Sequence, residues 1–139
     1  MVFHLFSTLP AYRDFGLLAV RLAAGAIFLA HGLQKKAMWK MAPSEQMPTN
    51  MLVIMRILSI AEPLGGLALL FGFLTPLAAL GLGIIMIGAM YLKMFTWKTP
   101  FIAMNKMGWE YDLILLSVML LLIFNGAGTW GLDRIFFGW

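Results

Sequence analysis

The chain contains no cysteine among its 139 residues, and its only histidines are His4 and His31. The absence of cysteine excludes disulfides, thiol redox chemistry, thiolate metal ligands and a cysteine nucleophile. Two histidines leave little basis for a metal site, and we expect none. A b-type haem normally takes two axial ligands, and His31 is the one histidine within an apolar run. A haem would therefore need its second ligand from a methionine or from another subunit.

Charge is also scarce, because charged residues make up 12% of the chain and hydrophobic residues 62%. Soluble domains are about a quarter charged and about half apolar. A soluble domain of this size could not cover its surface with so little polar material. The composition therefore predicts an integral membrane protein. The net charge is +4, and the lysines lie between apolar runs. Lysines in such loops are typical of membrane proteins, in which they set the orientation. We expect a lipid bilayer around the chain and no nucleic-acid partner.

Four apolar runs are near the length of about 20 residues that a helix needs to cross a bilayer. They cover about residues 15–34, 51–73, 76–94 and 109–125. The second and third runs are joined by so short a turn that we expect an antiparallel hairpin. The sequence thus predicts an all-α membrane protein, a four-helix transmembrane bundle that forms a single domain over residues 1–139. Aromatic residues near both ends predict short interfacial N- and C-terminal segments.

The distribution of basic residues predicts an orientation in the membrane. Loops 35–50 and 93–108 hold six lysines, whereas the other side of the predicted bundle has Arg13 and Arg134. The positive-inside rule places lysine-bearing loops in the cytoplasm. We therefore expect a multi-pass protein of the cell membrane, inner or plasma, with both termini outside.

Ionisable residues within or at the edge of the spans are the strongest sign of a functional site. They are Arg21, His31, Glu62 and Glu110, and a fifth, Arg56, is near enough to a span end to reach the interface. A charge in mid-bilayer costs at least about 2.5–3.5 kcal/mol, so each should face the bundle interior and find a partner. Depth along the helices predicts an Arg21–Glu62 ion pair, with His31 and Glu110 together towards the lysine loops.

Glycines accompany these residues on the same helix faces. Gly25 and Gly32 follow Arg21, and Gly65 and Gly66 follow Glu62. In lipid, small residues of this kind let neighbouring helices approach closely. We expect these four glycines to be structural.

The charged cluster has two interpretations that the sequence leaves open. Arg21, His31, Glu62 and Glu110 could form a polar pocket for a quinone headgroup, with His31 and Arg21 donating to carbonyl oxygens and a carboxylate relaying protons. Alternatively, the Arg21–Glu62 pair is a structural clasp, His31 hydrogen-bonds a carbonyl group, and Glu110 stabilises a helix N-terminus.

Several segments resemble those of DoxX-type membrane proteins. These segments are RLAAGAIFLAHGLQK from Arg21, EPLGGLALLFGFLTPLAA from Glu62, GWEYDLILL from Gly108 and GAGTWGLDRIF from Gly126. The resemblance implies a four-helix membrane bundle. It also implies an association with quinone-linked sulfur oxidation, terminal oxidase complexes or redox-stress protection. Distant relatives act as assembly factors for other membrane proteins.

Three functions follow as hypotheses. The first is a redox-associated subunit of a quinone-linked oxidoreductase, with quinone as its cofactor. The second is a non-catalytic assembly or interaction factor, which would bind a membrane protein or a second copy of itself. The third is binding or transport of a small molecule or lipid. The sequence does not decide whether the chain is an enzyme.

Overall fold

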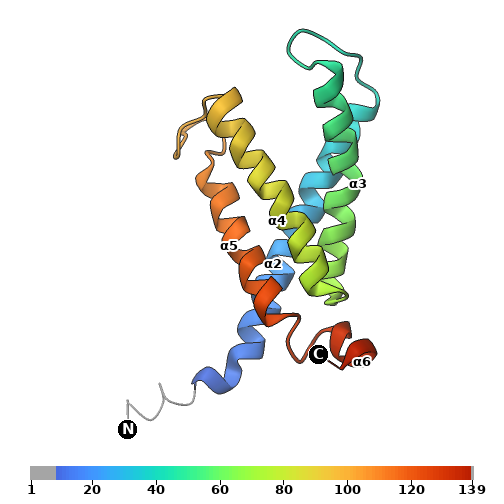
Figure 1. The fold of residues 1–139 in the computed structure, drawn as a ribbon, viewed down its shortest axis with the longest axis vertical. Helices are drawn as coiled ribbons and strands as arrows, with labels where there is room; N and C mark the ends of the chain where they lie inside the picture. Colours follow the sequence, from blue (N-terminus) through green and yellow to red (C-terminus); the bar gives the residue numbers. More distant parts are fainter. Residues whose placement is uncertain (1–8, 139) are drawn as a thin grey trace.

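The computed structural model describes residues 9–138, and every regular element in that part of the chain is helical. The elements are the 3-10 helix η1 (Leu9–Tyr12), α2 (Arg13–Gln34), the 3-10 helix η2 (Lys35–Trp39), α3 (Thr49–Phe71), α4 (Thr75–Tyr91), the π-helical turn η3 (Leu92–Thr96), α5 (Glu110–Asn125) and α6 (Leu132–Phe137). Figure 1 shows the arrangement of the α-helices. Most of the predicted N-terminal interfacial segment lies outside the described residues.

Three stretches are long and apolar enough to cross a membrane, namely Arg13–Trp39, Thr49–Phe71 and Thr75–Thr96. They correspond to the first three predicted spans, so the chain is an all-helical membrane protein. At the fourth predicted span, α5 has 16 residues. At about 1.5 Å of rise per residue, that length falls short of the roughly 30 Å of a typical hydrocarbon core. A fourth crossing therefore stays a prediction.

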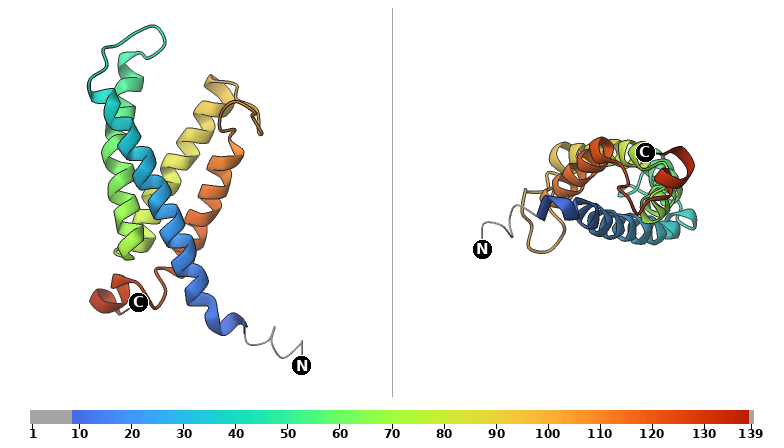
Figure 2. Two further views of the ribbon diagram at one scale, coloured as in Figure 1. Left: turned by 180° about the vertical axis from the view of Figure 1, so that it is seen from behind. Right: turned by 90° about the horizontal axis from the view of Figure 1, so that it is seen from below.

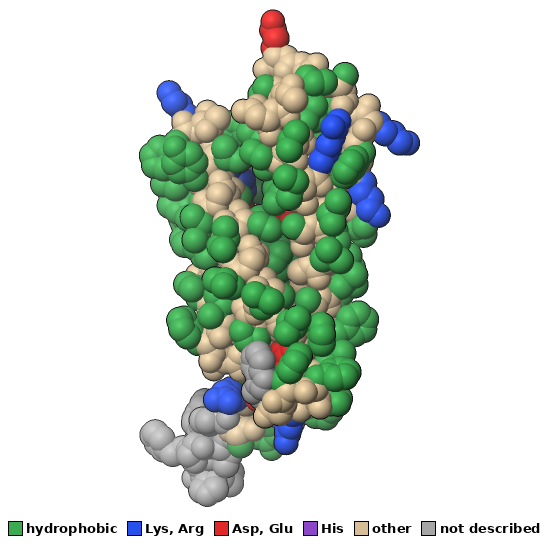
Figure 3. All heavy atoms as spheres, turned by 45° about the vertical axis from the view of Figure 1, so that its right-hand side comes forward, with side chains coloured by type: hydrophobic (Ala, Val, Ile, Leu, Met, Phe, Trp, Pro, Cys, Tyr) green, Lys and Arg blue, Asp and Glu red, His purple; other side chains and the backbone are tan. Residues whose placement is uncertain are grey.

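The long helices pack as two pairs, α2 with α3 and α4 with α5, and contacts between α3 and α4 are less extensive. The two pairs lie close together at the α3–α4 turn and diverge towards the lysine-bearing loops (Figures 1 and 2). In the space-filling view of Figure 3, apolar side chains cover the middle and charged side chains gather at the two ends. This distribution suits a bilayer, whose core excludes charge.

Glycines allow the close packing of α2 on α3. A Cβ atom added to Gly25 would lie 2.8 Å from the carbonyl oxygen of Gly66, and one added to Gly32 would overlap the ring of Pro63. Gly65, on another side of α3, lies against a leucine of α4. Each of the four glycines therefore lies at a contact between helices where a side chain has no room.

The turn between α3 and α4 is tight and strained. Gly72 ends α3 with φ 63°, a left-handed conformation that glycine adopts without steric cost. Leu74 also has a left-handed conformation, with φ 49°, which is unfavourable for a residue that has a Cβ atom. The carboxylate of Asp133 accepts hydrogen bonds from the backbone N–H groups of Leu74 and Thr75, so the C-terminal segment caps α4 and holds the strained turn.

Substitution Gly32→Ala should destabilise the fold, because the new methyl group would push α2 away from Pro63. Overpacking of this kind costs about 1–3 kcal/mol, so we expect a lower midpoint of thermal unfolding in detergent. The matched control is Gly16→Ala on the same helix, where a Cβ atom would meet nothing within 4 Å. Equal unfolding midpoints for the two variants would contradict this account of the α2–α3 contact.

Candidate functional site

A cavity of about 270 Å³ lies between the diverging helix pairs, towards the lysine-bearing loops. Figure 3 shows the surface hollowed in its upper half, with basic and acidic side-chain atoms in the hollow. Most of the lining is apolar. The polar side chains that line it are His31, Lys35, Glu62, Lys93, Tyr111 and Asp112.

One ion pair in the cavity joins α3 to the junction of α2 and η2. The Nζ atom of Lys35 contacts the carboxylate of Glu62. Glu62 lies near the middle of α3 and is 2% exposed, whereas Lys35 begins η2, one turn after His31. A carboxylate at this depth in an apolar helix needs a partner, and the lysine at the end of the neighbouring helix provides it.

A second ion pair joins the end of α4 to α5. The Nζ atom of Lys93 lies 2.6 Å from Oδ2 of Asp112 and also donates to the carbonyl oxygen of Gly108. Lys93 belongs to the π-helical turn η3, in which the wider winding changes the direction of the side chains. Irregular turns of this type are frequent at functional sites, and here the turn holds Lys93 in the cavity wall.

An aromatic contact connects the two helix pairs across the cavity. The rings of His31 on α2 and Tyr111 on α5 stack with their centroids 5.8 Å apart and their planes at 25°. Both side chains carry hydrogen-bonding groups and line the cavity. The cavity thus presents an imidazole and a phenol beside two cation–carboxylate pairs.

The charges in the cavity compensate one another. Lys35 balances Glu62 within the α2–α3 pair, and Lys93 balances Asp112 beside α5. The lining therefore brings no excess charge of either sign in the absence of a ligand. Such a site suits a neutral molecule with polar groups rather than a free ion.

The structure separates the four predicted site residues. His31 and Glu62 line the cavity, whereas Arg21 and Glu110 do not. The predicted Arg21–Glu62 ion pair is wrong, because Glu62 pairs with Lys35 and Arg21 bonds to carbonyl groups at the other end of the helices. His31 contacts Tyr111, the residue after Glu110, rather than Glu110 itself.

Sequence reasoning missed four of the polar lining residues, namely Lys35, Lys93, Tyr111 and Asp112. The two lysines stand at the ends of apolar runs, where the positive-inside rule already accounts for a lysine in a loop. The signal that could have found them is the presence of an acidic residue on the helix that follows each lysine. Lys35 precedes the helix of Glu62, and Lys93 precedes the helix of Asp112.

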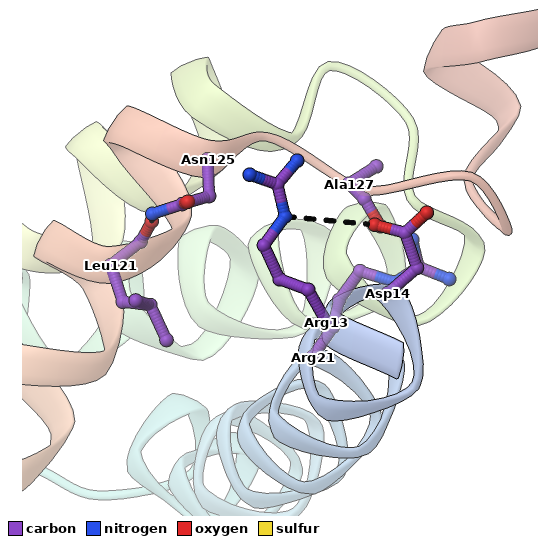
Figure 4. A network of polar contacts seen from close by, with 6 residues as sticks. All are labelled: Arg13, Asp14, Arg21, Leu121, Asn125 and Ala127. Atoms are coloured by element: carbon purple, nitrogen blue, oxygen red, sulfur yellow. Dashed lines mark hydrogen bonds and ion pairs between the residues drawn. The ribbon is translucent and has the colours of Figure 1, made fainter. Parts of the chain in front are cut away.

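Arg21 ties the C-terminal segment to α2. It is 1% exposed, and its guanidinium group donates to the carbonyl oxygens of Ala127 at 2.7 Å and Trp130 at 3.1 Å. Figure 4 shows this end of α2, with Arg13, Asp14 and Arg21 on the helix and Ala127 on the segment after α5. This arrangement is a structural clasp, distant from the cavity.

Among residues 9–138, no group of three or more histidine, aspartate or glutamate side chains is arranged to hold a metal ion. The polar groups of the cavity comprise single hydrogen-bonding rings and ion pairs.

The sequence model of the DoxX family matches residues 16–96. The matched range includes Lys35, Glu62 and Lys93, whereas Tyr111 and Asp112 lie beyond it. No curated protein and no solved structure matches the chain.

Substitution Arg21→Gln should loosen the C-terminal segment, because the carbonyl groups of Ala127 and Trp130 would lose a charged donor. Hydrogen bonds to charged groups contribute about 1.5–3 kcal/mol each, so we expect a lower unfolding midpoint and faster tryptic cleavage after Arg134. The matched control is Arg13→Gln, since the Arg13 side chain is 70% exposed. Cleavage at the wild-type rate in the Arg21 variant would argue against the clasp.

Proposed function

Since this chain belongs to the DoxX family of membrane proteins, we propose that it binds the headgroup of a membrane quinone as a redox-associated subunit. The observation that carries the proposal is the cavity, which combines apolar walls, two hydrogen-bonding rings and two internally compensated ion pairs. A quinone headgroup is flat and uncharged, with two carbonyl acceptors at opposite ends. It therefore matches a neutral cavity that carries donors on opposite walls.

The donors are distributed over both helix pairs. His31 and Lys35 come from the α2 side, and Tyr111 and Lys93 come from the α5 side. An N–H or O–H group from each side could donate to one carbonyl oxygen of the ring. The apolar side chains between them would contact its faces, as in most small-molecule sites.

The ion pairs provide a route for protons. Reduction of a quinone to a quinol takes up two electrons and two protons. Each lysine–carboxylate pair can release and regain a proton close to the ring, which is the task of a general acid. The electrons would come from a partner protein of the electron-transfer class, because this chain has no cysteine for thiol redox chemistry.

A lipid-soluble ligand could enter from the side. Four lining residues are exposed on the outer surface: Ile54 on α3, Gly88 on α4, Trp97 after η3 and Met107 before α5. We place the mouth of the cavity at Ile54, Gly88 and Trp97, between α3 and α4. A quinone dissolved in the bilayer would reach the cavity without crossing the polar loops.

The membrane arrangement belongs to the same proposal. We expect α5 to complete a four-helix transmembrane bundle in the cell membrane, with local thinning of the bilayer or its flanking tryptophan compensating for its length. The lysine-bearing loops lie together at one end, and the C-terminal segment lies at the other. The positive-inside rule then places the loops and the mouth of the cavity near the cytoplasmic side.

Purification in a mild detergent, followed by lipid extraction and mass spectrometry, tests the proposal directly. We expect quinone to co-purify in a fixed ratio to protein. A preparation that lacks quinone and also fails to bind added quinone would refute it. A defined membrane partner in such a preparation would instead support the assembly-factor hypothesis.

Substitution of the two rings tests the proposed donors. His31→Phe keeps a stacked ring and removes the imidazole nitrogens, and Tyr111→Phe removes only the hydroxyl group. Loss of one hydrogen bond costs about 0.5–1.5 kcal/mol, so we expect quinone affinity to fall by up to about tenfold in each variant. Quenching of tryptophan fluorescence can follow binding, since Trp97 lines the cavity. The control is Tyr91→Phe, on the exposed face of α4, and its affinity should equal that of the wild type.

Substitution Gly88→Phe tests the lateral mouth. A Cβ atom at Gly88 would meet nothing within 4 Å, so the helix should tolerate the larger side chain, which would obstruct the opening. We expect slower association of added quinone and little change in the unfolding midpoint. Gly16→Phe places the same side chain at another open site and should leave association unchanged. Wild-type kinetics in the Gly88 variant would exclude this route.

A further inference from the structure

A second hollow adjoins the cavity on the outer face of the α3–α4 seam. This groove has a volume of about 320 Å³, and its lining has no charged side chain. The lining includes Ala61, Gly65, Leu77, Gly81, Leu82 and Ile85.

The groove and the cavity share a wall. Ile85 lines both, and Ala61 in the groove is the residue before Glu62 in the cavity. From Ile85 the groove continues along α4 to Leu77, towards the α3–α4 turn. At about 1.5 Å per residue this path is roughly 12 Å long, and it runs from the middle of the apolar stretch Thr75–Thr96 towards its start. The cavity and the groove therefore lie next to each other along the α3–α4 seam, with Ile85 between them, and the groove is exposed on the outer surface at Leu77 and Gly81.

Small residues create the space in the groove. A Cβ atom at Gly81 would meet nothing within 4 Å, so this part of the groove is open. Gly65 lies opposite, on α3, where its missing side chain lets Leu82 of α4 pack closely. The base of the groove, at Gly65 and Leu82, is thus closely packed, and the space over Gly81 is open.

We infer that this groove holds the isoprenoid or alkyl tail of the ligand whose headgroup occupies the cavity. The inference rests on the proposed quinone site and specifies its ligand class: a quinone with a long apolar tail. The headgroup would lie beside His31 and Glu62, and the tail would pass Ile85 and lie over Gly81 towards Leu77. The order of polar and apolar surface along this path matches the order of head and tail in such a molecule.

The contribution of the tail should be moderate. A tail in the surrounding lipid is already in an apolar medium, so its transfer to the groove brings no hydrophobic gain. The gain comes from van der Waals contact with a preformed surface, which is small for each atom and adds up along the chain. We therefore expect a difference of about tenfold between tailed and tail-less ligands in this site, equivalent to about 1.4 kcal/mol.

The experiment compares two probes on three proteins. The probes are a tetramethyl quinone without a tail and a quinone with a ten-carbon alkyl tail, and the host is a nanodisc of zwitterionic lipid. The proteins are the wild type, Gly81→Phe and Gly16→Phe. We expect Gly81→Phe to lower affinity for the tailed probe about tenfold and to leave affinity for the tail-less probe unchanged. Gly16→Phe should change neither.

Other outcomes discriminate between the two proposals. Equal affinity for the tailed probe in wild type and Gly81→Phe would overturn the tail groove while the headgroup site stands. An equal loss for both probes would also overturn it, because the substitution would then act on the cavity. Failure of both probes to bind the wild type would refute the quinone site itself, and the tail inference with it.

A second variant tests the inference even if Gly81→Phe folds poorly. Leu77→Ala shortens an exposed wall of the groove and introduces no bulk, since Leu77 is 63% exposed. It should weaken binding of the tailed probe by a few-fold and leave the tail-less probe unchanged. Unchanged binding of the tailed probe to this variant would count against the inference in the same way.

Discussion

The need to pair every charge that the bilayer surrounds organises this molecule. An unpaired ionisable group in hydrocarbon costs several kcal/mol, so each buried charge must lie where another element offers a partner. Arg21 and Asp133 meet this need with backbone groups of the C-terminal segment and of the α3–α4 turn. Glu62 and Asp112 meet it with lysines at helix ends. The first set closes one end of the helices, and the second lines the cavity at the other.

Glycine placement and the clasp together explain why the two ends differ. Gly25 and Gly66 bring α2 and α3 into backbone contact. Arg21 ties the C-terminal segment to α2, and Asp133 on that segment holds the strained α3–α4 turn. No comparable clasp joins the two helix pairs at the opposite end of the described part of the chain, where the His31–Tyr111 stack is their aromatic contact. A rigid closed end thus allows an open end to remain as a cavity without loss of the fold.

Much of the fold was predictable from sequence, and the grouping of its polar residues was not. Apolar runs located the helices because hydrophobic length directly reflects the thickness of the membrane. Depth along single helices predicts an Arg21–Glu62 pair. That prediction is wrong because depth alone does not show which helix faces meet. The true partner of Glu62 is Lys35, which reaches inwards from a helix end. The role of Lys93 is harder to predict, because the direction of its side chain depends on the π-helical turn η3. No local pattern in the sequence indicates that turn.

The separation of clasp and cavity changes how the family resemblance can be interpreted. The segment from Arg21 to Lys35 contains one residue of the clasp at its start and two of the cavity, His31 and Lys35, at its end. The segment from Glu62 likewise begins in the cavity and ends at the turn that Asp133 caps. Each segment therefore combines residues that hold the fold with residues that line the proposed ligand site. A chain that kept Arg21 and Asp133 but lost the lysine–carboxylate pairs would have the physical basis for this fold without the basis for this site.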